Sequence, residues 1–354
     1  MTSNARKNII YSAVLLVVIM AVYFWRSNQA GETVSEVVEV TTGKLTLAGK
    51  TMGTTYNIVY LDEANRDFQT SIDSLLVVFN QSLSTYVPDS ELSKFNLGDT
   101  IDFKLPYFLP VLKASKAVFE KTGGAFDPTV GPLVNVWGFG PVGAELKDST
   151  DINLLLKLVG FDKIEFDEQQ LRKKIPGIYL DFSAIAKGYG VDVVGEFLIG
   201  NGIENFLIEI GGELVARGLN EKGELWKVGV NRPEESANAS ELISIIALQD
   251  RGMATSGNYR NYYVKDSVKI SHTINPATGY PVNHNLLSAT VLAKDCMTAD
   301  AYATALMVMG TEKAIALDIA LKEIEVFLVY SDSIGGFKTY ASETLKPFLS
   351  FVQE

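Results

Sequence analysis

Hydrophobic and polar positions repeat with two different periods along the chain after about residue 44. Apolar residues spaced by three and four predict helices, and strict alternation predicts half-buried strands. Helical spacing extends over 64–83, 107–121, 183–199, 297–309 and 312–321, and strand patterns extend over 56–61, 205–210, 214–218, 227–230, 242–248, 325–330 and 336–340. Because helices and strands are interspersed, with no fixed repeat and no internal linker, the pattern predicts one domain of the mixed α and β (α+β) class.

The N-terminal residues have a different pattern. Residues 9–25 form an uncharged apolar run that follows two basic residues. Its length suits either a minimal membrane-spanning helix or a signal-peptide core, so an uncleaved anchor and a cleaved signal both remain open. Asn28 stands where a signal-peptidase site would have a small residue, which favours the anchor. We therefore expect residues 1–8 in the cytoplasm, an inner-membrane anchor at 9–25, a polar spacer at 26–43 and a periplasmic catalytic domain at 44–354.

Composition narrows the function classes. The chain has 31 Lys and Arg against 42 Asp and Glu, a net charge of −11, which argues against a protein that binds the phosphates of nucleic acid. A hydrophobic content of 47% is enough for a packed core and excludes disorder as the main state. The single cysteine, Cys296, excludes an internal disulfide framework and a cysteine-rich metal site.

Residues 123–140 combine glycines, prolines and aromatic residues so densely that we expect an ordered loop rather than a helix or a strand. Glycines let a ligand approach the backbone, and an aromatic side chain such as Phe126 offers a face to a planar ring. Asp127 supplies a hydrogen-bond acceptor for a ring or a ribose. A purely structural cluster of turns is equally compatible with these residues.

Asp181 and Lys187 are predicted at the junction of a strand and a helix. Asp181 would end the strand, and Lys187 would lie in the first turns of the helix that follows. Helix N-termini favour anions, and a lysine at that position suits a diphosphate. An aspartate that caps a helix, followed by an exposed lysine, would give the same pattern.

Two further candidates come from later in the chain. Asp300 and Thr304 are four residues apart in a predicted helix, so both point from one face and offer oxygen ligands to Mg²⁺. A polar pair bonded within its own helix is the alternative. His272 lies in a loop rich in Pro and Gly, where a histidine acts as a base, holds a phosphate, or is simply exposed. The other histidine, His284, has no supporting pattern.

Taken together and in this order, these segments resemble the FAD:protein FMN transferase family, the ApbE-type flavin transferases. The resemblance covers essentially all of residues 44–345. It rests on the motifs Met52-Gly53-Thr54-Thr55-Tyr56, Leu83-Ser84-Thr85-Tyr86, Ser90 to Asn96, Gly124 to Thr129, Asp181 to Tyr189, Gly211-Gly212-Glu213, Thr255 to Tyr259, the His272 loop and the Asp300 helix.

The resemblance implies a reaction and a set of site residues. FAD would be the substrate, and with Mg²⁺ its FMN half would be transferred to a Thr or Ser hydroxyl of another protein, releasing AMP. FAD would contact Met52, Tyr86, Ala125, Phe126, Asp127, Asp181, Lys187 and His272. Mg²⁺ would be held by the backbone carbonyl of Ala184 and by Asp300 and Thr304. For catalysis we expect His272 to take the hydroxyl proton, with Asp181 as the alternative base and Lys187 as a second positive contact.

The resemblance further implies sheets flanked by helices, with FAD in a cleft between two lobes. The acceptors would be flavoprotein subunits of membrane electron-transport complexes, such as sodium-pumping quinone reductases or Rnf-type complexes. Glu213 and Asn275 stand where the family often has Asp, which leaves the hydrogen bonding of the diphosphate open. Two other functions remain possible, a Mg²⁺-dependent FAD pyrophosphatase and a flavin-binding protein without turnover.

Overall fold

The computed structural model describes residues 43–141, 151–234, 241–258, 262–265 and 268–352. The expected anchor at 9–25 and nearly all of the spacer lie outside these residues. Among the helices of the described residues, none is long and apolar enough to cross a membrane.

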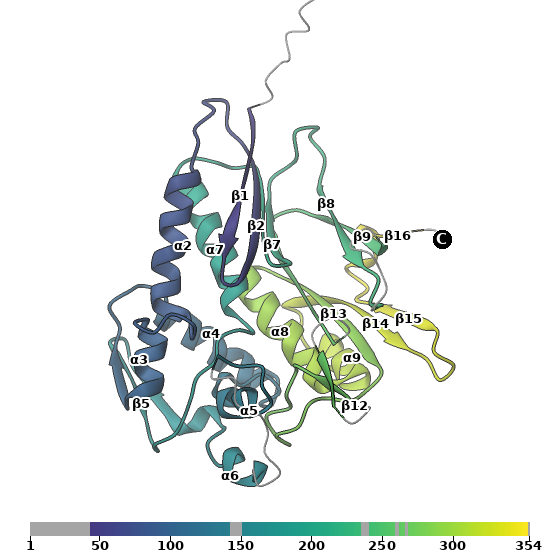
Figure 1. Cartoon of the computed structure of the whole chain (residues 1–354). Helices are drawn as coiled ribbons and strands as arrows, with labels where there is room; N and C mark the ends of the chain where they lie inside the picture. Colours follow the sequence, from purple (N-terminus) through teal and green to yellow (C-terminus); the bar gives the residue numbers. More distant parts are fainter. Residues whose placement is uncertain (1–42, 142–150, 235–240, 259–261, 266–267, 353–354) are drawn as a thin grey trace, which may run out of the picture. The chain divides into compact units, whose positions relative to one another are not determined.

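An antiparallel sheet of eight strands forms the centre of the described domain (Figure 1). In spatial order its strands are β1 (Lys44–Thr51), β2 (Thr54–Leu61), β6 (Phe206–Ile210), β7 (Glu213–Arg217), β10 (Arg251–Gly257), β13 (Leu286–Ala293), β14 (Ile324–Ser331) and β15 (Phe337–Ala341). Side chains alternate between the two faces of a strand, so one sheet can support two separate cores.

Helices cover one face of this sheet. The helices α7 (Ala186–Gly200) and α8 (Cys296–Met309) lie against its central strands, while α2 (Gln69–Leu83) packs on α7 and α9 (Thr311–Ala320) packs on α8 (Figure 1). Val291 of β13 belongs to the core under these helices, together with Leu306 of α8. The helical layer therefore fixes the position of α7 and α8 relative to the sheet.

A small sheet covers the other face. It consists of β8 (Trp226–Asn231), β9 (Leu242–Leu248) and β16 (Leu349–Phe351), in the order β16-β9-β8, and a short helical turn η3 (Lys346–Phe348) precedes β16. Leu292, the neighbour of Val291 in β13, points into the core on this side with Trp226 and Ile246. The domain thus has helices on one face of the main sheet and strands on the other.

The remaining elements form a smaller group beside α8. They are α3 (Glu91–Leu97), β3 (Thr100–Asp102), α4 (Phe108–Lys121), η1 (Pro128–Val130), α5 (Gly131–Val136), α6 (Ile152–Leu156), η2 (Phe161–Lys163), β4 (Ile164–Phe166), β5 (Gln170–Lys173) and the hairpin β11 (Tyr262–Lys265) with β12 (Val268–Ser271). The helix α4 packs directly against α8.

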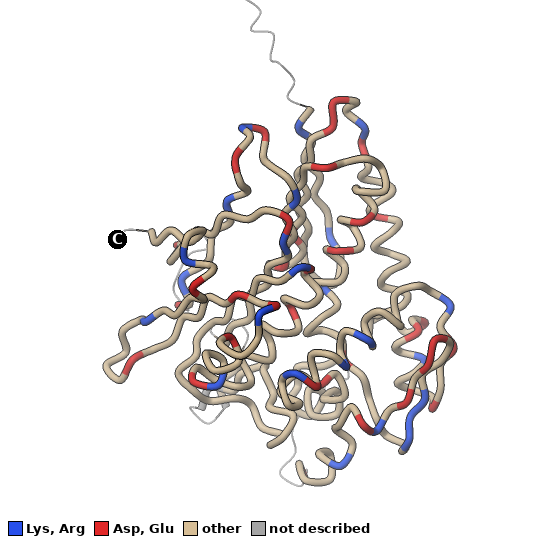
Figure 2. Tube along the Cα trace, turned by 180° about the vertical axis from the view of Figure 1, so that it is seen from behind, with Lys and Arg blue, Asp and Glu red and all other residues tan. Residues whose placement is uncertain are grey.

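Basic and acidic residues are interspersed along the described trace (Figure 2).

Two local predictions from the sequence are wrong. The segment 123–140 is not only loop, because it contains the turn η1 and the helix α5, with Pro132 in the first turn of α5, where a missing N–H costs nothing. The segment before Asp181 is not a strand of any described sheet, and the helix after it begins at Ala186 instead of residue 183. Asp181 is instead held by its N–H, which donates to the carbonyl of Pro128.

Candidate functional site

A cleft of about 890 Å³ opens where the main sheet divides. The strands β7 and β10 pair over three residues only, Leu214–Ala216 with Arg251–Met253, and then separate. Beyond that point the cleft is lined by the turn Gly211–Gly212 before β7 and by Thr255, Ser256 and Gly257 of β10. Strand edges and backbone groups therefore form much of its wall.

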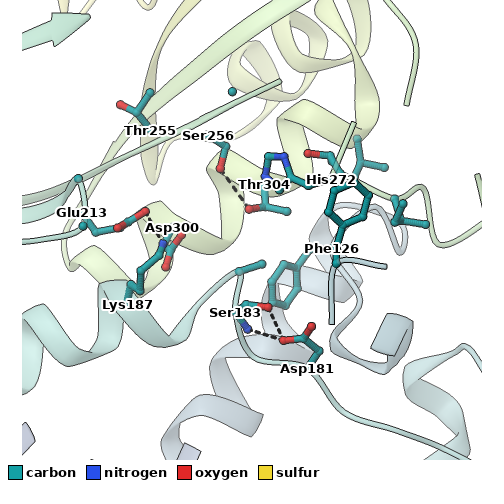
Figure 3. Close-up of a pocket in the computed structure, with 18 of the residues that line it drawn as sticks. Phe126, Asp181, Ser183, Lys187, Glu213, Thr255, Ser256, His272, Asp300 and Thr304 are labelled. Atoms are coloured by element: carbon teal, nitrogen blue, oxygen red, sulfur yellow. Dashed lines mark hydrogen bonds and ion pairs between the residues drawn. The ribbon is translucent and has the colours of Figure 1, made fainter. Parts of the chain in front are cut away.

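Ten of the eleven residues proposed from the sequence line this cleft. They are Tyr86, Ala125, Phe126, Asp127, Asp181, Ala184, Lys187, His272, Asp300 and Thr304. Figure 3 labels Phe126, Asp181, Lys187, His272, Asp300 and Thr304 among them. These ten residues come from the loop after α2, the loops around η1, the start of α7 and the segment before it, the segment after β12, and α8, which are far apart in the sequence. No local sequence pattern predicts that these residues lie together, so it is the tertiary fold that brings them into one cleft.

Met52 is not among the residues that line the cleft. It occupies the β1–β2 turn with a left-handed φ of 49° and packs against α7, so closely that a side chain at Gly190 would meet its methyl group. His284 does not line the cleft either. Its Nε2 is hydrogen-bonded with the carbonyl of Met307, and its Nδ1 accepts a hydrogen bond from the N–H of Leu286.

A buried charge cluster forms one end of the cleft. The ammonium of Lys187 lies 2.7 Å from Oε1 of Glu213, and the buried carboxyl of Asp300 interacts electrostatically with both. Burial disfavours the charged form of Lys187, but the two carboxylates outweigh that effect and raise its pKa. Burial raises the pKa of Glu213 to about 7 and also raises the pKa of Asp300, while Lys187 opposes both shifts. Oε2 of Glu213 has no hydrogen-bond partner among the described residues.

The start of α7 leaves a backbone oxygen available. In a regular helix the N–H of Gly188 would donate to the carbonyl of Ala184, four residues earlier. Here that N–H donates to Oδ2 of Asp300 instead, at 3.0 Å. A side chain at position 188 would collide with α8 near Cys296, so the glycine also permits the two helices to approach. The Ala184 carbonyl therefore lacks its helical partner at the edge of the cleft.

These atoms fit a small divalent cation. The Ala184 carbonyl, the Asp300 carboxylate and the Thr304 hydroxyl are all hard oxygen donors, which Mg²⁺ prefers. The Thr304 hydroxyl lies 3.2 Å from the hydroxyl of Ser256, so it points toward the cleft side of β10. Oε2 of Glu213, which has no hydrogen-bond partner among the described residues, is a further oxygen in the same region. The donor set is therefore sparse enough to leave positions for water and phosphate.

Two other carboxyl groups shape turns at the cleft. Oδ1 of Asp181 accepts hydrogen bonds from the N–H and the hydroxyl of Ser183. Oδ1 of Asp127 accepts from the N–H of Thr129 at 2.8 Å and from its hydroxyl at 2.6 Å. Burial raises the pKa of Asp127 to about 6. In each case one oxygen fixes the backbone, and the residue still lines the cleft.

His272 is held by its surroundings. Its neighbours Ser271 and Thr273 both donate hydroxyl hydrogen bonds to Oδ1 of Asn258, at 2.7 and 2.9 Å. Its ring also meets Phe139, another residue of the cleft wall, in a T-shaped arrangement. The imidazole thus lines the cleft on a fixed backbone.

Some residues of the site had no clear signal in the sequence. Glu213 appeared there only as part of a motif, and its burial beside Lys187 depends on the pairing of β7 with β6. Ala184 could not be found by reasoning from side chains, because the only group it could offer a ligand is its carbonyl, which lacks a helical partner since the N–H of Gly188 donates to Asp300. The sequence alone does not show that Asp300, on a later helix, accepts a hydrogen bond from the N–H of Gly188.

Comparisons with known proteins agree with this geometry. The family model described as the ApbE family matches residues 52–328. The chain is 44% identical to a FAD:protein FMN transferase of Vibrio cholerae, over 86% of this chain and 92% of the relative. It is 39% identical to the FAD:protein FMN transferase of Haemophilus influenzae, over 85% of this chain and 90% of the relative.

Solved structures give the same result. The flavin transferase ApbE from Vibrio cholerae superposes with a TM-score of 0.76 at 42% identity, covering 86% of this chain and 99% of that one. The apo form of the flavinyl transferase ApbE from Pseudomonas stutzeri superposes with a TM-score of 0.77 at 31% identity, covering 86% and 96%.

Proposed function

The chain belongs to the ApbE family, and we propose that its cleft transfers the FMN half of FAD to a hydroxyl of another protein. The protein is a FAD:protein FMN transferase, with FAD as its substrate. The reaction forms a bond between the FMN phosphorus and a Thr or Ser oxygen, breaks the bond to the AMP oxygen, and moves the hydroxyl proton to a base.

The observation that carries this proposal is the grouping of Lys187, Glu213 and Asp300 beside the oxygens of Ala184 and Thr304 in one cleft. We propose that Asp300, Thr304 and the Ala184 carbonyl hold Mg²⁺. When bound, the ion would supply the positive charge that a diphosphate needs as its bridging bond breaks. Lys187 sits at the N-terminal turn of α7, where its ammonium and the helix dipole both favour a phosphate oxygen.

The proton of the acceptor hydroxyl is assigned to His272. The imidazole lines the same cleft as Lys187 and Thr304, and an unperturbed histidine titrates near working pH. Asp181 is the alternative base, but one of its oxygens already accepts two hydrogen bonds from Ser183. We therefore favour His272, whose backbone is fixed through Asn258.

The flavin is expected at the other part of the cleft, near Phe126 and Tyr86. Phe126 is buried, whereas Tyr86 is 70% exposed and lines the cleft from the loop after α2. An exposed aromatic ring at the rim can cover a planar ring system. We propose that Ala125, Phe126 and Asp127 hold FAD through this loop. Gly131, the first residue of α5, permits this helix to begin against Tyr179, since any side chain there would overlap the Tyr179 ring.

Location and acceptors extend the proposal. We propose that residues 9–25 anchor the chain in the inner membrane, so that the domain faces the periplasm. The acceptors would then be flavoprotein subunits of sodium-pumping quinone reductases or Rnf-type complexes. Fractionation of cells that express the full chain, with protease added to intact spheroplasts, tests this placement. Protection of the domain in spheroplasts would contradict it.

A direct assay separates the transferase from its two alternatives. The full chain is incubated with FAD and MgCl₂, with and without a recombinant acceptor domain from a sodium-pumping quinone reductase. Flavin fluorescence of the acceptor on a denaturing gel and release of AMP are followed together. AMP and free FMN without regard to the acceptor would identify a pyrophosphatase, and FAD binding without AMP in any condition would leave only a flavin-binding protein.

A further inference from the structure

The strand β8 has one open edge. In the small sheet the order is β16-β9-β8, so among the described strands β8 is hydrogen-bonded to β9 alone. On its other side, Lys227 and Gly229 have no strand partner in the described part of the chain. Such an edge is a template for another extended segment.

The ladder shows which backbone groups point to the open side. The N–H of Arg232, the residue after β8, donates to the carbonyl of Glu241, so Arg232 faces the β9 side. Neighbouring residues of a strand direct their backbone groups to opposite sides, so Val230 and Val228 of β8 face β9 as well. Their partners in the register are Ser244 and Ile246, and the bulge of this ladder lies beyond Ser244, on β9. Gly229, which lies between Val228 and Val230, therefore directs its N–H and C=O away from β9.

The open edge faces the cleft. Four consecutive residues, 228–231, line the cleft that also contains Lys187 and Thr304. Side chains of consecutive strand residues point to opposite faces of a sheet, so one face alone would supply only every second residue. Contact with all four residues, Gly229 through its backbone, is the pattern that a cleft along the edge of the strand would give. Gly229 has no side chain to obstruct that edge.

We propose that the acceptor protein enters the cleft as an extended segment that pairs with the open edge of β8 through the backbone of Gly229. The inference rests on the proposed transferase function, which requires a polypeptide to bring its hydroxyl to the diphosphate. Backbone pairing tolerates different sequences while it fixes the direction and register of the added strand. It would direct alternate side chains of the segment to opposite sides, so one Thr or Ser can point toward the cluster at Lys187.

A pair of variants isolates the Gly229 N–H. A side chain at position 229 would lie 2.7 Å from the methyl groups of Leu242, so both variants carry Leu242→Ala to remove that clash. Gly229→Ala in this background keeps the N–H, whereas Gly229→Pro removes it. Proline is compatible with an edge strand where its missing N–H faces away from the ladder. Equal melting temperatures of the two variants would show that the ladder to β9 is intact.

The kinetic assay measures FMN transfer by the full chain, with FAD and MgCl₂, to the acceptor domain from the sodium-pumping quinone reductase. We expect Gly229→Pro to raise KM for the acceptor at least about fivefold over Gly229→Ala, the effect of losing one hydrogen bond and blocking the edge. KM for FAD and AMP release without acceptor should match in both variants. Equal acceptor KM values would overturn the inference, and so would a rise in KM for FAD alone, which would assign the edge to the nucleotide.

Hydrogen exchange provides a second readout. In wild-type protein, a saturating acceptor domain with its target Thr replaced by Ala should slow amide exchange in 226–231, because the Gly229 N–H becomes bonded. Unchanged exchange in this segment, together with unchanged acceptor KM, would exclude pairing at β8. A wild-type protein that transfers no FMN to any acceptor would instead count against the proposed function itself.

Discussion

Replacing Lys187 with Met tests the buried charge cluster. The substitution keeps a long apolar stem and removes the ammonium that lies 2.7 Å from Glu213. Glu213 and Asp300 are 5% and 2% exposed, so two carboxyl groups would lose their compensating charge. Removing one partner of a buried ion pair costs about 3–5 kcal/mol. Because the Lys187 side chain is still 29% exposed, we expect the lower end, about 3 kcal/mol at pH 8.

The expected loss in melting temperature follows from the size of the domain. An unfolding entropy of about 2.1 cal/mol/K per residue over about 300 residues gives a decrease of roughly 1.5 °C for each kcal/mol. Lys187→Met should therefore melt about 5 °C lower than wild type at pH 8. Calorimetry or near-UV circular dichroism measures this difference. Lys113→Met is the matched control, since Lys113 pairs with Glu168 at an exposed position and its loss should have little effect.

The loss should depend on pH. Burial raises the pKa of Glu213 to about 7, and Lys187 opposes that shift, so its removal raises this pKa further. A carboxyl whose pKa is raised by folding is most compatible with the folded state when protonated, and its stabilising contribution is lost as the pH rises through that pKa. The deficit of Lys187→Met should thus be smaller at pH 5.5 than at pH 8. The loss of stability caused by Lys187→Met should also be smaller when the protein carries Glu213→Gln as well.

Equal losses at both pH values, with no recovery in the double variant, would refute this reasoning and assign the effect to packing.

The effect of Mg²⁺ on stability can be measured by the same method. We expect MgCl₂ to raise the melting temperature of Lys187→Met more than that of wild type, because the cation meets two carboxylates without a competing ammonium. No difference between the two proteins would argue against a cation site next to Asp300.

Three further predictions concern Asp127 and His272 of the cleft, and Asp192 of α7, which joins that helix to the start of α8. Asp127→Asn keeps the hydrogen-bond acceptor for Thr129 but cannot ionise. The stability of this variant relative to wild type should therefore increase as the pH rises from 4 through about 6, where the wild-type carboxyl loses its proton. Unfolding in urea at pH 4.5 and at pH 7.5 measures the difference. Asp192→Ala removes the carboxylate that accepts from the N–H groups of Cys296 and Met297 and should lower stability by about 2–3 kcal/mol, measured in the same way, with Asp192→Asn intermediate. His272→Asn should reduce FMN transfer by about 10²–10⁴ with little change in FAD affinity, and an unchanged single-turnover rate would exclude His272 as the base.

Elements with a clear period could be predicted from the sequence. The predicted strand 242–248 has the same bounds as β9, because its buried positions alternate with less buried ones. The predicted helix 312–321 differs from α9 by one residue at each end. The central strand β13 was not predicted. Val291 packs under the helices and Leu292 under the small sheet, so both of its faces are apolar and no alternation remains. A strand buried on both sides cannot be recognised by its period.

The placement of a candidate residue could be predicted where helical spacing determines it. Asp300 and Thr304 line one cleft, as their spacing of four on a helix indicated, and Lys187 lies in the first turn of α7. The Ala184 carbonyl came from the family resemblance alone, because no property of an alanine side chain marks it. Met52 lies in the β1–β2 turn against α7 and is not among the residues that line the cleft, so its contact with FAD stays a prediction. The burial of Glu213 depends on contacts between segments far apart in the chain.

The central claim is the transfer of FMN to a protein hydroxyl in this cleft. The most direct measurement is intact mass spectrometry of the acceptor domain after incubation with the full chain, FAD and MgCl₂. The account predicts that the acceptor gains the mass of one FMN less water on a single Thr or Ser, with one AMP released per modified acceptor, and that Asp300→Ala abolishes both. AMP release with an acceptor of unchanged mass would contradict it.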